Sequence, residues 1–380
     1  MRDGLSSCSH TGDGCSRSEM IPAATGRFGD THLLAPLDDA VRDSLARILS
    51  LSGLVHRAIG SMIELDCVQR AESSPIATLK ELLPVTLQQR IKGVFFDNSA
   101  SRTAESLISI LLHAELLPAL FDALDVEWAR AVLLEDRLFS VYHPIVNATD
   151  GGLFAYEALI RARHPFDGEV VGAKQLIYAC ERLNLHNALD QCARITALKD
   201  ASKLNLHGAK LFMNFLPSSI YEPEVSFRST IEAASQYGIS MERLVFEVIE
   251  TEQIENMETL RTVVEYYREH GAGIALDDIS SGFASLQYLA DLMPDYAKID
   301  RNLVTSAVEN DSCRHTLDSL CGLARKLNVK VIAEGIETTR QMDICLEAGV
   351  DYMQGFLFAL PAAPPNPIYL PEYFSQSKAA

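Results

Sequence analysis

Two adjacent carboxylates, Asp277 and Asp278, follow the apolar run that begins at Gly273, and a loop of small residues comes next. This pattern is typical of a buried strand that ends at the edge of a sheet. Neighbouring side chains on a strand point to opposite faces, but two acids can converge where the backbone already bends. Carboxylates this close repel each other unless a cation or a proton lies between them. The pair is therefore a candidate metal site, and solvated acids at the start of a loop are the plain alternative.

Polar side chains also interrupt or end most other apolar runs in the last two thirds of the chain. They are Glu157, Asn214, Glu247, Lys298, Glu334 and Gln354. A buried carboxylate costs several kcal/mol unless it is paired or bound to metal, so one shared site explains the set more simply than separate ones. Oxygen donors suit Mg²⁺ or Mn²⁺, and two such ions about 3.5–4 Å apart favour displacement at phosphorus. Lys298 is the expected cationic partner, and the absence of a His or Cys cluster argues against zinc.

The elements that would position these residues alternate between short apolar runs and helical stretches from about residue 129 onward. The predicted strands are Phe139–Val146, Leu153–Arg161, Lys210–Phe215, Leu244–Ile249, Gly273–Leu276, Tyr296–Ile299, Lys330–Ala333 and Asp351–Met353. The predicted helices between them are Ala173–Arg182, Leu189–Lys199, Val225–Tyr237, Met257–His270, Ala284–Leu292, Arg301–Leu327 and Thr339–Ala348. This alternation predicts an α/β fold, a TIM-like (β/α)₈ barrel over residues 129–380, whose chemistry gathers at the C-terminal ends of the strands.

The first third of the chain has a different pattern. Residues 1–28 are rich in Ser, Gly and Asp, and we expect a flexible leader. Residues 29–128 predict a mostly helical region with an apolar stripe from Val41 to Met62, a helix over Ile76–Ile91 that Pro84 breaks or kinks, and a helix from Ser101 to about Leu124. Two interpretations stay open: a small helical bundle, or a regulatory module that receives a signal or dimerises through the first stripe.

Composition restricts the class of protein further. The net charge of −18 argues against DNA or RNA as partners, because those surfaces require basic residues. Eight scattered cysteines without a CxxC pair indicate a reducing compartment. No secretory signal is visible, and the most apolar window, Leu107–Phe121, is shorter than the ~20 residues of a membrane span. We expect a cytoplasmic protein with no membrane partner.

Eight blocks in the last two thirds of the chain resemble, in content and order, the bacterial EAL-domain cyclic-di-GMP phosphodiesterases. They are Tyr142-His-Pro-Ile-Val146, Tyr156-Glu-Ala-Leu-Ile-Arg161, Met213-Asn-Phe215, Phe246-Glu-Val-Ile-Glu250, Asp277-Asp278, Lys298-Ile-Asp300, Ala333-Glu-Gly-Ile-Glu-Thr338 and Gln354-Gly-Phe356. The resemblance covers about residues 129–380 and leaves out the first third. It implies a TIM-like barrel, which agrees with the strand pattern, and hydrolysis of one phosphodiester of cyclic-di-GMP to linear pGpG with two ions of Mg²⁺ or Mn²⁺.

The resemblance also implies roles for individual residues. Glu157, Asn214, Glu247 and Asp277 match the ligands of the first metal, and Asp277, Asp278 and Glu334 match the groups around the second. Lys298 and Glu334 match the groups that orient and deprotonate the attacking water. Arg161 matches the contact to the substrate phosphate, and Glu157 and Gln354 complete the substrate-binding group. Glu250 matches the anchor of the loop after Asp278, and Glu337 matches a residue that supports the site.

Two departures from the family pattern bear on activity. Ile279 and Ser280 replace the Phe and the first Gly of the usual Asp-Asp-Phe-Gly-x-Gly loop, and His143 stands where Gln is commonest. A β-branched residue and the loss of Gly can stiffen a loop that positions the second metal and often lies at a dimer contact. The alternative to an active enzyme is therefore a catalytically weak or inactive domain that acts as a cyclic-di-GMP receptor. A third hypothesis is an unrelated metal-dependent phosphoesterase barrel. We also expect a homodimer and a protein partner for residues 29–128.

Overall fold

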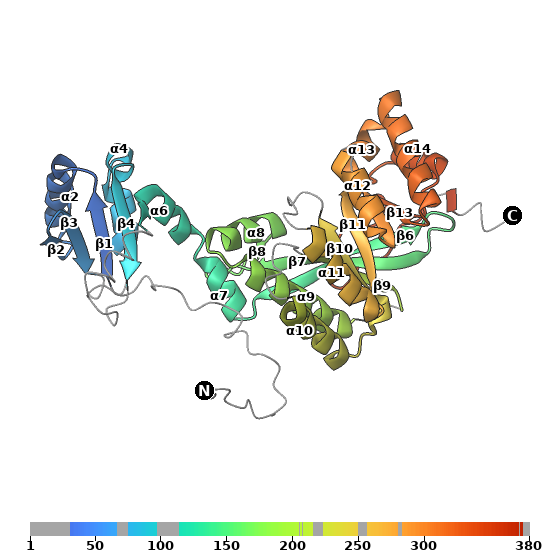
Figure 1. The fold of residues 1–380 in the computed structure, drawn as a ribbon, viewed down its shortest axis with the longest axis horizontal. Coiled ribbons are helices and arrows are strands. Elements are labelled where there is room, and N and C mark those ends of the chain that lie inside the picture. The colour runs from blue at the N-terminus through green and yellow to red at the C-terminus, as the bar shows by residue number, and fades with distance from the viewer. Residues whose placement is uncertain are drawn as a thin grey trace. The chain divides into compact units, whose positions relative to one another are not determined.

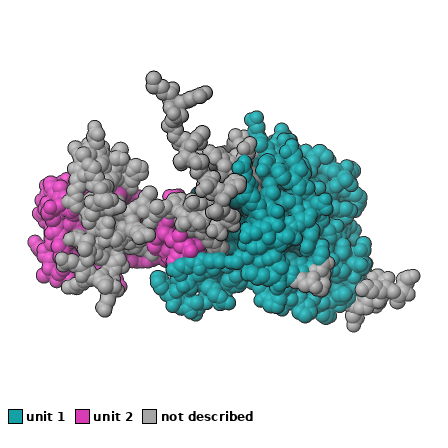
Figure 2. All heavy atoms as spheres, turned by 90° about the horizontal axis from the view of Figure 1, so that it is seen from below, with its two compact units in different colours: residues 1–17, 135–177, 186–380 teal, residues 18–134, 178–185 magenta. Residues whose placement is uncertain are grey.

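The computed structural model describes residues 31–66, 75–96, 114–204, 206, 208–215, 223–249, 257–279, 283–371 and 373–374. The expected leader, together with Glu250 and Ser280, lies outside these residues. The chain divides into two compact units (Figure 2). The larger unit contains residues 1–17, 135–177 and 186–380, and the smaller one contains residues 18–134 and 178–185.

The smaller unit contains a sheet that the sequence did not predict. Within the described residues the sheet has five antiparallel strands in the order β2-β3-β1-β4-β5. The strands are β1 (Thr31–Pro36), β2 (His56–Ile59), β3 (Met62–Asp66), β4 (Ile91–Phe96) and β5 (Glu115–Leu116), and the helices are α2 (Asp39–Ser52), α3 (Pro75–Leu82), α4 (Val85–Gln88), α6 (Leu117–Asp125) and α7 (Trp128–Leu134). From β1 to β4 the order is β1-α2-β2-β3-α3-α4-β4, which is the split βαβ arrangement with two short helices in place of its second helix. The helical-bundle interpretation is therefore wrong, and the region is mixed.

The predicted helical stripe from Val41 to Met62 is correct within α2 and wrong beyond it. This helix begins at Asp38, whose carboxylate accepts the Val41 amide at 2.9 Å, and it ends at Gly53, whose φ of 71° is left-handed. Ile59 and Met62, which the stripe placed on the same helix, instead pair with each other at the turn of the β2–β3 hairpin. The first half of the stripe is buried in the core of its own unit, so no continuous stripe is left for pairing with a second copy. The predicted break at Pro84 is confirmed, between α3 and α4.

The larger unit is built around a closed barrel, and this part of the prediction is confirmed (Figure 1). Within the described residues eight strands close in the order β6-β14-β13-β12-β11-β10-β9-β7, with β6 paired to β7, and β8 (Val170–Val171) adds a ninth beside β7. They are β6 (Leu138–Asn147), β7 (Leu153–Arg163), β9 (Lys210–Phe215), β10 (Leu244–Ile249), β11 (Gly273–Ile279), β12 (Tyr296–Ile299), β13 (Lys330–Ala333) and β14 (Tyr352–Gln354). Strand β6 runs antiparallel to both of its neighbours, and the others are parallel to theirs around the barrel.

Helices follow the barrel strands in chain order, as expected for β/α units. They are α8 (Ala173–Arg182), α9 (His186–Ser202), α10 (Pro223–Gln236), α11 (Met257–Glu269), α12 (Phe283–Leu292), α13 (Arg301–Ser306), α14 (Asp311–Lys326) and α15 (Thr339–Ala348). The predicted helix Arg301–Leu327 is two helices, because Asn310 caps α14 by accepting the amides of Ser312 and Cys313. Among the described helices, none is both long enough and apolar enough to cross a membrane.

Two apolar clusters hold this unit together. The larger one lies between the strands and the helices, and it includes Phe215, Phe246 and Tyr267. The smaller one includes Ile145, Ala155, Phe212, Val245, Ala275, Tyr296 and Ile332, one residue from each of seven barrel strands, as expected of a layer inside the barrel. Each large aliphatic or aromatic side chain buried in this way contributes about 1.5–3 kcal/mol to stability. The inner layer is a rigid apolar base for the residues that follow it on each strand.

Candidate active site

A polar layer follows the apolar layer inside the barrel. Because inward-facing positions alternate along a strand, the next inward residues lie two places further along the parallel strands and two places earlier on the antiparallel strand β6. Those residues are His143, Glu157, Asn214, Glu247, Asp277, Lys298, Glu334 and Gln354, one from each strand or its end. The ladders support this alignment: Asn214 lies opposite Glu247, and His143 lies opposite Glu157. Sequence reasoning named every member as a candidate except His143, which only the antiparallel β6–β7 pairing brings to the layer.

Asp277 and Asp278 converge because the backbone bends between them. The β11–β12 ladder shifts register between Leu276 and Ile279, and Asp278 has a left-handed φ of 57°. A non-glycine residue in this region is uncommon and usually marks a functional constraint. One carboxylate oxygen from each of Asp277, Asp278 and Glu334 lies within 4.8 Å of the others. The sequence-based prediction that two adjacent acids share one site at the strand end is therefore consistent with the geometry.

Lys298 lies among four carboxylates. Its side chain is 1% exposed, and Nζ lies 2.7 Å from Glu247 Oε1, 2.7 Å from Glu334 Oε1, 3.1 Å from Asp277 Oδ1 and 3.6 Å from Glu157 Oε1. Burial alone would lower the pKa of Lys298, but the four carboxylates outweigh it and hold the pKa well above its usual value. A single ammonium cannot balance four carboxylates, so the cluster favours further positive charge.

Two of these acids resist ionisation in the metal-free cluster. Glu247 is completely buried, and within the described residues its Oε2 has no partner and its Oε1 has only the Lys298 ammonium. Burial raises the pKa of Glu247 well above its usual value, although Lys298 opposes the shift. Burial also raises the pKa of Glu334 to about 8, again against Lys298. Burial and the neighbouring Asp277 raise the pKa of Asp278 to about 6.

Glu157 behaves differently because it has donors on two sides. Gln354 Nε2 donates to its Oε2 at 2.8 Å, and Asn214 Nδ2 donates to its Oε1 at 3.4 Å. Burial would raise the pKa of Glu157, but Lys298 and these amides together lower it. Because the Asn214 nitrogen is turned toward Glu157, its carbonyl oxygen is the group left for an ion.

The donor set fits hard divalent cations. It consists of carboxylate and amide oxygens, with an unpartnered buried oxygen on Glu247 and three acids gathered around a common point. Ions such as Mg²⁺ and Mn²⁺ take such ligands, and they would supply the missing positive charge. The residues present therefore fit a divalent metal centre.

Arg161 and Glu337 lie outside the polar layer, and the position of a third candidate is not described. Arg161 is half-buried on β7, two inward positions beyond Glu157, and its Nη1 donates to the Ile160 carbonyl at 2.7 Å. Burial lowers the pKa of Arg161, with Glu157 opposing the shift. Glu337 pairs with Arg301 at 3.1 Å on the surface, where the two side chains are 40% and 60% exposed. The third candidate, Glu250, lies outside the described residues.

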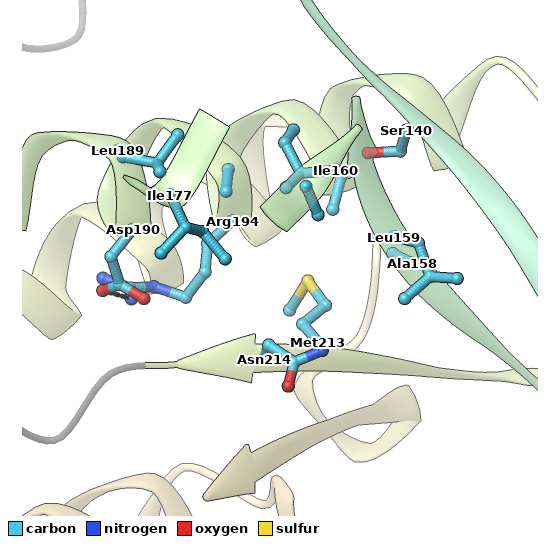
Figure 3. Close-up of a pocket in the computed structure, with 13 residues that line it drawn as sticks. Ser140, Ala158, Leu159, Ile160, Ile177, Leu189, Asp190, Arg194, Met213 and Asn214 are labelled. Carbon is cyan, nitrogen blue, oxygen red and sulfur yellow. Dashed lines mark hydrogen bonds and ion pairs between the residues drawn. The ribbon is translucent and has the colours of Figure 1, made fainter. Parts of the chain in front are cut away.

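A cavity of about 220 Å³ adjoins the polar layer at Asn214 (Figure 3). Its apolar wall includes Leu159, Ile160 and Met213 from β7 and β9, and α9 contributes the buried ion pair Asp190–Arg194. Arg194 Nε also donates to Thr230 Oγ1 at 3.0 Å. Sequence reasoning missed this pair, because an Asp and an Arg four residues apart on a helix look the same in sequence as an exposed ion pair.

Residues 126–361 match the family model described as the EAL domain. The chain belongs to the EAL-domain family. The match begins just before α7 and ends after the last barrel strand, so it covers the barrel and every member of the polar layer. The resemblance noted in the sequence is therefore confirmed.

Curated relatives and a solved structure share this domain. The chain is 30% identical to cyclic di-GMP phosphodiesterase NbdA of Pseudomonas aeruginosa over 62% of this chain and 30% of the relative. It is 32% identical to probable cyclic di-GMP phosphodiesterase PdeG of Escherichia coli over 67% of this chain and 52% of the relative. A standalone EAL protein of Vibrio cholerae, solved with c-di-GMP bound, superposes with a TM-score of 0.56 at 33% identity, covering 63% of this chain and 97% of that one. The chain spans about a third to a half of these curated relatives.

The raised pKa values predict how the stability of the metal-free EAL domain depends on pH. Glu334 and Glu247 hold protons more tightly in the folded state, so stability should fall as pH rises from about 6.5 to 8. Glu334 alone should account for a loss of about 1–2 kcal/mol over this range, at ~1.4 kcal/mol per pH unit, and Glu247 adds to it in the same direction. His143, whose pKa burial lowers, acts in the opposite direction only below its usual value of 6.5, and Lys298 matters only above 10.5.

This prediction is checked by urea unfolding across that pH range, once with EDTA and once with saturating Mn²⁺. The Mn²⁺ series should be flatter with pH, because the ions replace the protons. A metal-free midpoint that stays constant or rises with pH would contradict the proposed charge balance.

Proposed function

We propose that this chain hydrolyses one phosphodiester of cyclic-di-GMP to give linear pGpG, with two ions of Mg²⁺ or Mn²⁺. The observation that carries the proposal is the polar layer. In this layer Lys298 Nζ lies within 3.6 Å of four carboxylates, those of Glu157, Glu247, Asp277 and Glu334. In this proposal the first ion is held by Glu157, Asn214, Glu247 and Asp277, and the second by Asp277, Asp278 and Glu334. The activity named for NbdA and PdeG supports it.

The chain's own groups can serve this reaction. Bound divalent ions supply an acidified water and neutralise charge that develops at phosphorus. Glu334 lies beside Lys298 and close to Asp277 and Asp278, so it is placed to accept the proton of the attacking water. Lys298, 2.7 Å from Glu334, holds that carboxylate in place and adds positive charge at a non-bridging oxygen. Lys298, together with Gln354 and Asn214, keeps Glu157 ionised as a ligand.

Arg161 is proposed as the contact to the substrate phosphate. It lies on the same face of β7 as Glu157, four residues or about 13 Å along the strand toward its C-terminal end. The guanidinium must leave the Ile160 carbonyl to reach a phosphate oxygen, for which its planar fork is suited.

The cavity beside Asn214 is proposed to take one guanine base. Its walls are apolar, as the faces of a purine require, and it shares Asn214 with the proposed first metal site. The Asp190 carboxylate, which is paired with Arg194, can accept N–H groups from the edge of guanine. Adenine offers no such paired donors, so the cavity favours a guanine dinucleotide.

A product assay tests the proposal. Purified full-length chain is incubated with cyclic-di-GMP and Mn²⁺, Mg²⁺ or EDTA, and the products are identified by chromatography against pGpG. We expect pGpG with either ion, none with EDTA, and little cleavage of cyclic-di-AMP as the base control. Cleavage of another nucleotide in preference to cyclic-di-GMP would mean that this EAL domain has a different substrate; an unrelated phosphoesterase is already excluded by the family match.

A receptor that binds cyclic-di-GMP without cleaving it is the second candidate function. It is motivated by Ile279, which replaces the family Phe and is buried directly after Asp278. The test is the double change Ile279→Phe with Ser280→Gly. If the unchanged protein binds the ligand without making pGpG and the double variant makes pGpG, the receptor is correct. If the unchanged protein already makes pGpG, the receptor hypothesis fails.

The wider organisation stays a set of predictions. We propose a regulatory region over residues 29–128, a homodimer, a protein partner for that region and a cytoplasmic location. The split βαβ sheet supports a separate regulatory unit, because it has its own core of Leu34, Leu45, Ile63, Leu65 and Phe121.

A further inference from the structure

The segment that follows Glu334 is held closely on two sides. Gly335 has a φ of 65°, and a Cβ at this position would lie 2.4 Å from Arg301 Cγ, so only glycine fits. The next residue, Ile336, donates its amide to the Gln354 carbonyl at 3.0 Å and accepts the Leu357 amide at 2.9 Å. The direction of the Glu334 side chain therefore depends on what fixes this segment.

Gln341 on α15 holds the far end of the same segment. It is 7% exposed, and its Oε1 accepts the amide of Glu337 at 2.8 Å and both the amide and the hydroxyl of Thr338 at 3.0 and 3.2 Å. Its Nε2 donates to Thr305 Oγ1 on α13 at 3.2 Å. One buried amide group thus joins the segment after Glu334 to the helix that follows Lys298.

Helix capping explains only part of this arrangement. Thr338 and Gln341 form a capping box at the start of α15, which accounts for their reciprocal bonds. Capping does not require the bond to the Glu337 amide or the bond to Thr305, which joins two separate helices. Helix α13 begins three residues after Lys298, and the Glu334 amide donates to the Ile299 carbonyl at 3.1 Å. The two strand ends and the two helices therefore form one connected unit.

We propose that Gln341 is a positioning residue for the metal centre. By tying α15 and the segment after Glu334 to α13, it sets the 2.7 Å spacing between Lys298 Nζ and Glu334 Oε1. This spacing decides whether the Glu334 carboxylate is turned toward Lys298 or toward Asp277 and Asp278, and so it sets the affinity for the second divalent ion. The inference rests on the proposed two-ion function. Groups that orient metal ligands without touching the ion commonly change affinity by about 10–100-fold.

The test is Mn²⁺ binding to the full-length chain, measured from the loss of the free Mn²⁺ electron paramagnetic resonance signal. Thr305→Val removes the bond to Gln341 at an exposed position and leaves the capping box intact. We expect about tenfold weaker binding at the weaker of two sites, with the other site unchanged. Thr305→Ser, which keeps the hydroxyl, should restore binding. Gln341→Leu should weaken the same site more, and in turnover it should raise the Mn²⁺ concentration for half activation more than the KM for substrate.

Asn310→Ala is the matched control. It removes another helix cap of the same unit, away from the polar layer, so it should lower the Tm and leave Mn²⁺ binding unchanged. If Thr305→Val and Gln341→Leu bind Mn²⁺ as the unchanged protein does, the positioning role is wrong while the proposed function stands. If the unchanged protein binds no Mn²⁺, both are overturned.

Discussion

Replacing Lys298 with methionine is expected to abolish pGpG formation and to destabilise the metal-free protein by about 3–5 kcal/mol, the cost of removing one partner of a buried ion pair. Methionine fills a similar volume, so the effect reports the charge. Without the ammonium, Glu247 and Glu334 lose their 2.7 Å partner while Asp277 and Glu157 stay close to them. Proton uptake by the cluster will limit the loss, since the pKa of Glu334 already lies near 8.

Metal should separate the two effects of this substitution. Saturating Mn²⁺ neutralises the same carboxylates, so it should restore most of the lost stability while turnover stays absent. Urea unfolding with EDTA or Mn²⁺ measures the first effect, and the product assay measures the second. Lys330→Met is the control: Lys330 pairs with Asp351 at 2.7 Å but is 55% exposed, and such pairs contribute about 0–1 kcal/mol. Full turnover in Lys298→Met would show that the reaction does not require Lys298.

The barrel could be predicted because its strands are short apolar runs separated by helices, which indicates an α/β fold, and because eight such strands in about 250 residues fit a (β/α)₈ barrel. The polar layer could be predicted for a related reason. A carboxylate in a buried strand is costly, and the C-terminal ends of parallel strands meet at one end of the barrel. The convergence of Asp277 and Asp278 on one site required only that the strand bend, and the left-handed φ of Asp278 provides that bend.

The remaining features depend on pairings that a single sequence does not reveal. Val55, Ile59 and Met62 continue the apolar spacing of α2, so their periodicity does not distinguish a longer helix from the β2–β3 hairpin. The helix ends instead at Gly53, which adopts a left-handed conformation. His143 reaches the polar layer only because β6 runs antiparallel to β7 and opposes it to Glu157. The role of Gln341 arises from a contact with Thr305 on another helix, 36 residues earlier in the chain.

Glu334→Gln should produce opposite changes in activity and stability. Glutamine keeps the shape and one oxygen donor but cannot accept the proton of the attacking water, so kcat should fall by about 10²–10⁴-fold. The same change removes one of the carboxylates that crowd Lys298. Because burial already raises the pKa of Glu334 to about 8, its charged form is unfavourable in the metal-free protein. At about pH 8.5 the variant should therefore be more stable without metal, by roughly 1–3 kcal/mol.

The gain in stability distinguishes this outcome from simple misfolding. A misfolded variant loses activity and stability together. A variant that lacks a catalytic carboxylate whose charge destabilises the fold loses activity without losing stability. The measurements are kcat for pGpG release with Mn²⁺ and urea midpoints with EDTA. Glu347→Gln, an exposed change on α15, serves as the control and should alter neither quantity. A kcat within tenfold of the unchanged protein would exclude Glu334 as the proton acceptor, and a lower midpoint with EDTA would mean that the acidic cluster stabilises the fold even without metal.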